Sequence, residues 1–257
     1  MAEPNPEKLF NLGMLSYDKQ DFSKAKEYFE KACGLNNGRG CNGLGVLYRD
    51  GQGAEKNLTK ASQYFSKACG LNNGWGCDNL GDLYQNGQGV EKNLTKAAQF
   101  YTKACDLNIG LGCFNAGVSY ENGQGVENNS EKAAQFYSKA CDLNNNKGCF
   151  NLGALYQNGQ GVEKDLIKVA YFYTKACDLK DGLGCFNLGT LYLEKDSKKA
   201  VALFEKACDL NIGRGCGALG FLYGSGNGVE KDLTKAAQYV SKACKLGFQE
   251  ACEMLKE

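Results

Sequence analysis

The fourteen cysteines of this 257-residue chain form seven pairs, and seven residues separate the two members of every pair. The pairs are Cys33 and Cys41, Cys69 and Cys77, Cys105 and Cys113, Cys141 and Cys149, Cys177 and Cys185, Cys208 and Cys216, and Cys244 and Cys252. Each pair follows the preceding one by 36 residues, apart from one step of 31 residues. This period indicates a repeat protein in which every unit carries one cysteine pair.

The spacing within a pair does not fit one straight helix. Cα atoms of residues eight apart on a helix lie about 12 Å from each other, whereas a disulfide needs them within roughly 7 Å. The residues between two cysteines, such as Asp106–Gly112, include the Asn and Gly that end helices and form turns. We therefore expect each pair to span a turn and to link one helix to the next.

Two other roles of the cysteines compete with disulfides. Zinc sites usually combine two close-spaced Cys-x-x-Cys pairs, or Cys with His, and this chain has no histidine and no such pair. Free cysteines buried as small core residues are also common. Leu9 argues for bonds, because it stands where later repeats have their second cysteine, at the one place with no earlier helix to supply a partner. If the two cysteines of a pair are bonded, a repeat that lacks one partner should lack the other as well, as is the case at Leu9.

Bonded thiols require an oxidising compartment, so we expect a secreted or periplasmic protein. Such a protein needs a signal peptide, which the polar stretch Met1–Glu7 does not resemble, and we expect that it has been removed. No apolar run of fifteen residues occurs, so no membrane span is expected. The 30 basic and 29 acidic residues are spread evenly and form no basic stripe, which argues against nucleic acid as a partner.

Each repeat reads as two helices, here called helix A and helix B, with a loop between them. In one unit, the apolar and small residues of helix A follow the i, i+3, i+4, i+7 spacing of a single helical face: Cys149, Leu152, Gly153 and Tyr156. Gly153 would let the two helices approach closely. The glycines of the loop 158–162 suit a left-handed helix terminus, and Asp165 is expected to cap helix B.

Asn57 and Asn93 each begin a glycosylation sequon, but they occupy the position of Asp165 and are interpreted as helix caps. We expect one elongated domain over residues 1–257. Its repeats are placed at 6–36, 37–72, 73–108, 109–144, 145–180, 181–211 and 212–247, with a C-terminal cap at 248–257 that contains a helix from about Gln249. The first and sixth repeats lack the glycine-containing loop after Tyr17 and Tyr192, so both resemble plain tetratricopeptide units.

A family resemblance is carried by Lys-Ala-Ala-Gln-Phe-Tyr-x-Lys-Ala-Cys at 96–105 and 132–141, together with the recurring Leu-Gly-x-Leu-Tyr and Gly-x-Gly-Val. These motifs resemble the Sel-one-like repeat, a relative of the tetratricopeptide repeat, and the seven cysteine pairs are similar to those of the Helicobacter cysteine-rich protein family. The resemblance covers the whole chain. It implies an all-α fold, a right-handed superhelical α-solenoid of about seven α/α repeats, with disulfides that join helix B of one repeat to helix A of the next.

Positions that vary between repeats are free to contact a ligand, and one stripe of helix A varies in this way. In a tetratricopeptide-like superhelix this stripe lines the concave groove. Beside it lies a ladder of asparagines, Asn79, Asn115, Asn151 and Asn187, preceded by Asn11. Asparagine is a mediocre helix former, and its amide could pair with the backbone of an extended peptide, as the resembled tetratricopeptide family implies. Alternatively, the amides bond neighbouring helices.

Aromatic residues beside the ladder are further candidates for the groove. Phe114, Phe150 and Phe186 could offer apolar pockets to a ligand or could pack between repeats, and Trp75 could be an exposed anchor. We therefore expect a monomeric scaffold, without metal or cofactor, whose groove binds an extended peptide or protein segment, or a cell-wall fragment.

The alternative function is β-lactam binding with weak hydrolysis, because members of the resembled family have been described as penicillin-binding proteins with weak β-lactamase activity. The usual signature combines Ser-x-x-Lys with Ser-Asp-Asn and Lys-Thr-Gly. Only Ser16-Tyr17-Asp18-Lys19 matches, and neither other element occurs. We attribute this match to chance and assign no catalytic residue.

Overall fold

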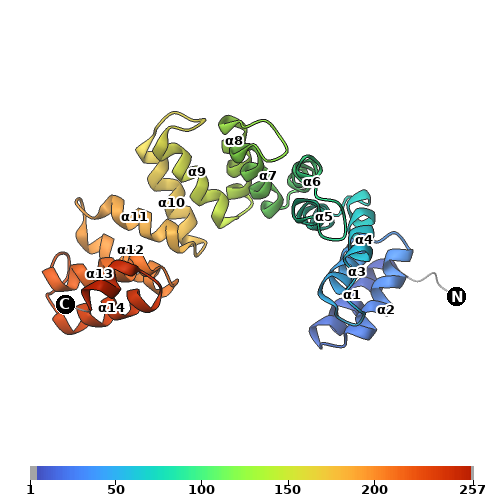
Figure 1. Ribbon diagram of the computed structural model, residues 1–257, viewed down its shortest axis with the longest axis horizontal. Coiled ribbons are helices and arrows are strands. Elements are labelled where there is room, and N and C mark those ends of the chain that lie inside the picture. Colours follow the sequence, from blue (N-terminus) through green and yellow to red (C-terminus); the bar gives the residue numbers. More distant parts are fainter. Residues whose placement is uncertain (1–4, 256–257) are drawn as a thin grey trace. The chain divides into compact units, whose positions relative to one another are not determined.

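The computed structural model describes residues 5–255, which form fifteen α-helices and no strand (Figure 1). The ends of the expected domain, residues 1–4 and 256–257, lie outside the described part. The helices are α1 (Pro6–Asp18), α2 (Phe22–Gly34), α3 (Gly38–Asp50), α4 (Leu58–Gly70), α5 (Gly74–Asn86), α6 (Leu94–Asp106), α7 (Gly110–Asn122), α8 (Ser130–Asp142), α9 (Asn146–Asn158), α10 (Leu166–Asp178), α11 (Gly182–Tyr192), α12 (Ser197–Asp209), α13 (Gly213–Ser225), α14 (Leu233–Lys245) and α15 (Gln249–Met254).

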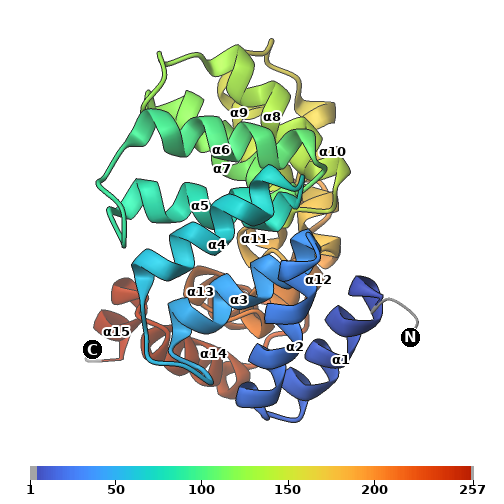
Figure 2. The same ribbon diagram turned by 90° about the vertical axis from the view of Figure 1, so that its right-hand side faces the viewer.

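The expected all-α solenoid of helix pairs is confirmed, with odd-numbered helices as A and even-numbered helices as B. The chain divides into two compact units, Met1–Leu143 with α1 to α8, and Asn144–Glu257 with α9 to α15. Figure 2 shows the A/B pairs of the first unit, α1 with α2 through α5 with α6, one after another. Within this unit the A helices also contact each other in the order α1, α3, α5, α7.

Local sequence signals set the helix ends. The Asp165 side chain caps α10, and Asn57 and Asn93 accept hydrogen bonds from backbone N–H groups at the starts of α4 and α6, so the cap interpretation is confirmed. The loop glycines Gly159 and Gly161 both have positive φ, as the left-handed terminus requires. The expected final helix begins at Gln249.

Close packing of A against B depends on small residues in helix A. A Cβ atom at Gly153 would lie 2.8 Å from the ring of Tyr173, a side chain of α10 that is 1% exposed. The same arrangement recurs at Gly81 beneath Tyr101. The expectation that glycine permits close approach of the helices is therefore confirmed, and the buried aromatic residue of helix B fills the space.

Disulfides link each helix B to the next helix A within both units. They join Cys33 to Cys41, Cys69 to Cys77, Cys105 to Cys113, Cys177 to Cys185, Cys208 to Cys216, and Cys244 to Cys252. Cys141 and Cys149 are not free either, and their mutual pairing stays a prediction. The structure thus replaces the zinc and free-thiol alternatives with one covalent link per repeat.

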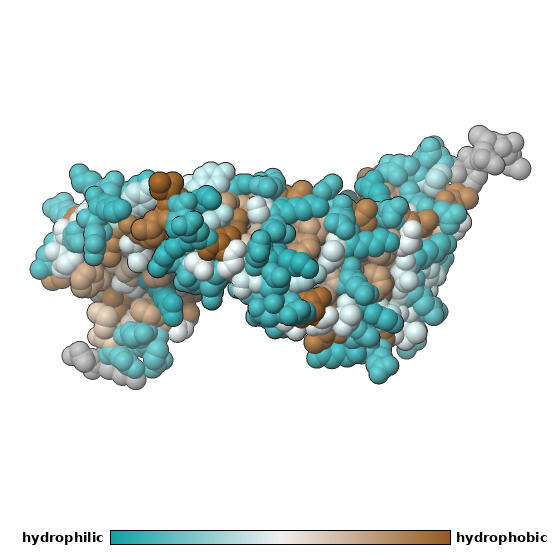
Figure 3. Space-filling model, turned by 90° about the horizontal axis from the view of Figure 1, so that it is seen from above, coloured by the Kyte–Doolittle hydropathy of each residue, from teal (hydrophilic) through white to brown (hydrophobic). Residues whose placement is uncertain are grey.

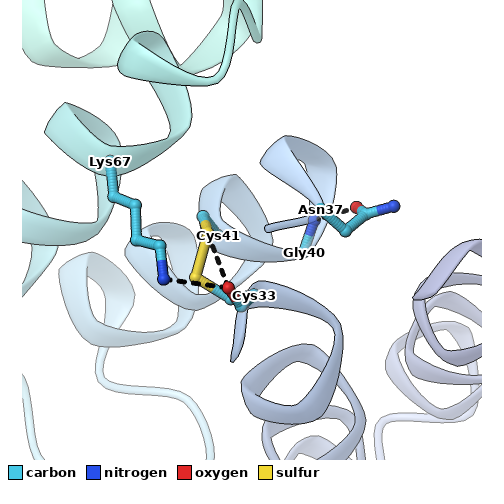
Figure 4. The surroundings of a disulfide bond; sticks show 5 residues. All are labelled: Cys33, Asn37, Gly40, Cys41 and Lys67. Atoms are coloured by element: carbon cyan, nitrogen blue, oxygen red, sulfur yellow. Dashed lines mark hydrogen bonds between the residues drawn. A yellow bond between two sulfur atoms is a disulfide. The ribbon is translucent and has the colours of Figure 1, made fainter. Parts of the chain in front are cut away.

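Figure 4 shows how hydrogen bonds support one of these links. Lys67 Nζ, from helix B of the following repeat, donates to the carbonyl oxygen of Cys33 at 2.9 Å. Asn37 caps α3 by accepting from the backbone N–H of Gly40 at 2.8 Å. A cation at the carbonyl end of α2 and a cap at the start of α3 both stabilise the turn that the disulfide closes.

Removing the Cys105–Cys113 disulfide by alanine substitution of both residues is expected to lower the free energy of unfolding by about 2 to 3 kcal/mol, because it frees a nine-residue loop in the unfolded chain. Urea unfolding followed by circular dichroism measures the loss. The matched comparison is the Cys244–Cys252 pair, which closes a loop of the same length and should therefore cost a similar amount when both cysteines are replaced by alanine. Clearly unequal losses in the two double variants would contradict this account.

Candidate functional site

A groove in the first unit, lined by residues of α1, α2 and α3, the start of α5 and the N-cap of α7, encloses about 680 Å³. We call it the Trp75 groove. It is lined by Phe10, Met14, Tyr17, Phe29, Arg39, Asn42, Gly43, Val46, Asn72, Asn73, Gly74, Trp75 and Ile109. Trp75 is 51% exposed and Met14 is 38% exposed, so two large apolar side chains meet solvent in one depression. Elsewhere, on the face shown in Figure 3, hydrophilic residues predominate and hydrophobic residues form small separate patches.

A break in the asparagine ladder sets the floor of the groove. Helix α3 has Gly43 at the position that Asn11 and Asn79 occupy in the neighbouring A helices. A Cβ at Gly43 would lie 2.9 Å from the Phe29 ring, so the glycine leaves this ring as the floor. The absence of a side chain therefore creates apolar space where an amide would otherwise stand.

Arg39 forms one wall of the groove and is held from two sides. Its guanidinium lies 4.2 Å from the centroid of the Phe10 ring, and Nη1 donates to Glu7 Oε1 at 2.6 Å. Stacking and pairing together restrict the side chain, although the pair itself is exposed and contributes little stability. The groove thus has a fixed cationic wall whose charge is offset by Glu7.

A network of polar side chains continues from the groove along α3, α5 and α7. Asn79 Nδ2 donates to Asn42 Oδ1 at 3.0 Å, and Asn79 Oδ1 accepts from Arg49 Nη1 at 2.9 Å. Asn115 Nδ2 donates to Asp78 Oδ1 at 3.1 Å. These contacts join side chains about one repeat apart in sequence, so they tie consecutive A helices together.

Two aspartates of α5 have raised pKa values. Burial, together with the nearby charge of Asp82, raises the pKa of Asp78 to about 7, while the hydrogen bond from Asn115 works in the opposite direction. Burial also raises the pKa of Asp82, against a hydrogen bond from Tyr101 and the attraction of Arg49. The pKa of the Tyr101 hydroxyl is raised by burial and by Asp82, so it remains a donor to Asp82 Oδ1 at 2.7 Å.

The structure places the sequence-predicted site residues in different surroundings. Trp75 lies in the groove. Asn79 and Asn115 bond neighbouring helices, and Asn187 lies near the Tyr173 hydroxyl, where it opposes the rise in the pKa of Tyr173 caused by burial. Asn151 is partly buried on α9. A ligand-binding role for these four asparagines stays a prediction.

The three predicted phenylalanines are partly buried and lie against aromatic residues of helix B. The ring centroids are 6.0 Å apart for Phe114 and Tyr137, 5.6 Å for Phe150 and Tyr173, and 5.6 Å for Phe186 and Phe204. None of the three lines the Trp75 groove. Their surroundings match the packing alternative, and pockets for a ligand at these residues stay a prediction.

Some residues of the site were not singled out by sequence. Met14 and Ile109 line the groove, and Arg49 and Glu121 belong to the polar region beside it. Ile109 carries a detectable signal, because it stands at the N-cap of a helix A, where α3, α5, α9 and α11 have asparagine or aspartate and α13 alone shares an isoleucine, Ile212. An apolar residue at a position that normally caps a helix is a deviation that the repeat comparison could have found.

Ser16 is 8% exposed, and its hydroxyl donates to the carbonyl oxygen of Leu12 at 3.0 Å. This bond within α1 is the usual way in which a helical serine is satisfied. Within residues 5–255, no group of three or more His, Cys, Asp or Glu residues is arranged to hold a metal ion. Over the same residues, no helix has the length and apolar character needed to cross a membrane.

Disulfide-linked A/B helix pairs that stack through a chain define an α-solenoid repeat protein. The chain belongs to the Sel1 repeat family, whose model matches residues 38–73, 76–109, 110–145, 146–181, 182–212 and 214–248. Residues 9–39 match the tetratricopeptide repeat model, as the short first repeat predicts. The sixth repeat, which also lacks the loop, matches the Sel1 model, so its interpretation as a plain tetratricopeptide unit is corrected.

Known proteins place the chain further within this family. The structure of cysteine rich protein B from Helicobacter pylori is 43% identical and covers 51% of this chain and 93% of its own, with a TM-score of 0.43. Its Sel1 repeats and their seven cysteine pairs make the chain a cysteine-rich Sel1-repeat protein. A Sel1 repeat protein from Oxalobacter formigenes is 28% identical, with a TM-score of 0.81, and covers 94% of this chain and 99% of its own.

Curated relatives match only short stretches of the chain. The protein named beta-lactamase HcpA from Helicobacter pylori is 52% identical over 58 residues, which are 23% of this chain and 23% of HcpA. The matched stretches span about a fifth of the length of the curated relatives. This similarity shows that repeats of this chain are related to repeats of those proteins.

Proposed function

We propose that the protein is a binding scaffold that takes an extended peptide or protein segment in the Trp75 groove. The observation that carries this proposal is the joint exposure of Trp75 and Met14 above a floor formed by Phe29. Exposed aromatic residues in a depression are typical of binding hot spots. Stacked helical repeats also create extended binding surfaces, which agrees with the family.

The compartment proposed for this scaffold is extracytoplasmic, either secreted or periplasmic. The disulfides that join helix B of one repeat to helix A of the next support it, because such bonds persist in oxidising surroundings. The monomeric state expected from sequence is proposed with it.

The alternative function, β-lactam binding with weak hydrolysis, has less support. It rests on the names of relatives such as HcpA, which match the chain over short stretches. Ser16, the nucleophile that Ser-x-x-Lys would offer, is a buried residue whose hydroxyl donates to the carbonyl oxygen of Leu12. The geometry therefore favours the peptide-binding scaffold.

Substituting Trp75 by alanine is expected to weaken peptide binding by about 30-fold, because the indole supplies the largest exposed apolar surface of the groove. Peptides are selected on the intact disulfide-bonded protein from a displayed random library, and their affinities are measured by isothermal titration calorimetry. Ile167→Ala is the control, since Ile167 is 84% exposed on α10, outside the groove. Selected peptides that bind the Trp75 variant as tightly as the parent protein would contradict the proposal.

A further inference from the structure

Charges on the A helices beside the Trp75 groove are compensated unequally. Arg39 is paired with Glu7, and Arg49 Nε lies 2.8 Å from Asp50 Oδ1. Three acidic residues of α5 and α7, namely Asp78, Asp82 and Glu121, form no ion pair with any residue in the described range 5–255. The arginines of this region are thus paired with other carboxylates, and Arg49 also attracts Asp82 at longer range. Because the raised pKa of Asp78 leaves its carboxyl partly protonated near neutral pH, the negative charge without an ion pair rests mainly on Asp82 and Glu121.

Part of this negative charge lies on the helix that carries Trp75. Trp75, Asp78 and Asp82 are spaced by three and four residues on α5, so they share one face of that helix. With a rise of 1.5 Å per residue, the Cα atoms of Trp75 and Asp82 are about 10 Å apart along the helix. Glu121 comes from the end of α7, the A helix that packs next to α5.

Tyrosines of helix B hold two of the three carboxylates in place. Asp82 Oδ1 accepts from the Tyr101 hydroxyl, and Glu121 Oε2 accepts from the Tyr137 hydroxyl. Both tyrosines are fully buried residues of the repeat core, whereas Asp82 and Glu121 are partly exposed. In each carboxylate the second oxygen, Asp82 Oδ2 or Glu121 Oε1, has no hydrogen bond from the described part of the chain. A carboxylate that is fixed through one oxygen and open through the other is suited to accept from an ammonium or guanidinium group.

On the basis of the proposed function, we propose that the Trp75 groove selects a basic peptide segment, in which a lysine or arginine follows or precedes an apolar residue. The apolar residue contacts Trp75 and Met14, and the cationic side chain binds the carboxylates of Asp82 and Glu121, which form no ion pair within residues 5–255. An extended chain advances about 3.3 Å per residue, so a separation of about 10 Å corresponds to roughly three residues between the two. A peptide that has an acidic residue in place of this lysine or arginine is repelled by the two carboxylates and is excluded from the groove.

The test uses three matched sets of acetylated and amidated peptides of about nine residues with a fixed Phe-Leu anchor. The position about three residues from this Phe-Leu anchor carries Lys in one set, Gln in the second and Glu in the third. The affinities of the peptides for the intact protein are measured by calorimetry. The Lys set is expected to bind about tenfold more tightly than the Gln set, and the Glu set more weakly than either.

Variants assign the selectivity to the two carboxylates. The double variant Asp82→Asn with Glu121→Gln keeps an acceptor for each tyrosine and is expected to reduce the Lys-to-Gln affinity ratio to about one, without changing the affinity of the Gln set. Glu127→Gln removes one exposed charge in the loop after α7 and should keep the ratio. A ratio that survives in the double variant would overturn the assignment to these residues.

Two further outcomes separate this inference from the function on which it rests. Equal binding of the Lys and Gln sets by the unmodified protein, with both weakened by Trp75→Ala, would overturn the charge selectivity and leave the groove as a peptide site. A lack of Trp75-dependent binding in all three sets would overturn the groove itself.

Discussion

Replacing Gly125 by alanine is expected to lower the free energy of unfolding by about 2 to 5 kcal/mol. Gly125 is the second glycine of the loop between α7 and α8 and has a φ of +74°, a conformation that costs an alanine energy. A Cβ at this position would also collide with the carbonyl group of Leu94 and the backbone nitrogen of Thr95, at the start of helix B of the preceding repeat. Backbone atoms in a helix cannot move aside as a flexible side chain can.

The measurement is urea unfolding of the disulfide-bonded protein, with Gly70→Ala as the matched control. Gly70 is the last residue of α4, and a Cβ there would meet nothing within 4 Å. Alanine at this position should leave stability unchanged or raise it by up to about 1 kcal/mol. If both variants lose the same stability, the loop of one repeat does not depend on close contact with the preceding helix B.

Substituting Asp78 by asparagine is expected to stabilise the protein near pH 8 by at most about 4 kcal/mol and to have little effect near pH 4. The pKa of Asp78 is raised from 3.8 to about 7 in the folded protein, because the carboxyl is buried next to Asp82. The folded state therefore keeps a proton that the unfolded chain releases. Asparagine keeps an oxygen acceptor for Asn115 and removes the ionisable group.

The sign of the pH dependence follows from that shift. Asp78 contributes stability that is fully present below its unfolded pKa of 3.8 and is lost as the pH rises through about 7. The groups around it are Asp82 on the same helix, Asn115 on α7, and Tyr101 and Arg49 near Asp82. Urea midpoints at several pH values measure the effect, with the exposed Asp18→Asn as control. Parallel pH profiles for Asp78→Asn and the parent protein would contradict a raised pKa.

Much of the fold follows from short-range signals in the sequence. The cysteine spacing excludes one straight helix, and the caps at Asn57, Asn93 and Asp165 fix the starts of three B helices. Gly153 is the point of contact with an aromatic residue, as its place between apolar residues indicates. These predictions succeed because each depends on residues a few positions apart.

The site is harder to predict because its contacts join residues of different repeats. The asparagine ladder is visible in the sequence, but only the structure shows Asn79 bonded to Asn42 and Asn115 bonded to Asp78. Asp78 lies on the variable stripe of helix A, a pattern that predicts contact with a ligand, yet it is 2% exposed. The aspartate at position 78 has its partner, Asn115, on the next helix A. The sequence pattern within one repeat does not include that partner.

The most direct test of the account uses Trp75, the only tryptophan of the chain, as a reporter of its own groove. Its emission spectrum is recorded while a peptide selected for tight binding is added, and the titration is compared with calorimetry of the same peptide. We predict that the emission shifts to shorter wavelength with the same saturation midpoint as the heat signal, because the peptide shields the half-exposed indole from water. Saturable binding by calorimetry with an unchanged Trp75 spectrum would contradict the account, since the peptide would then bind outside the groove.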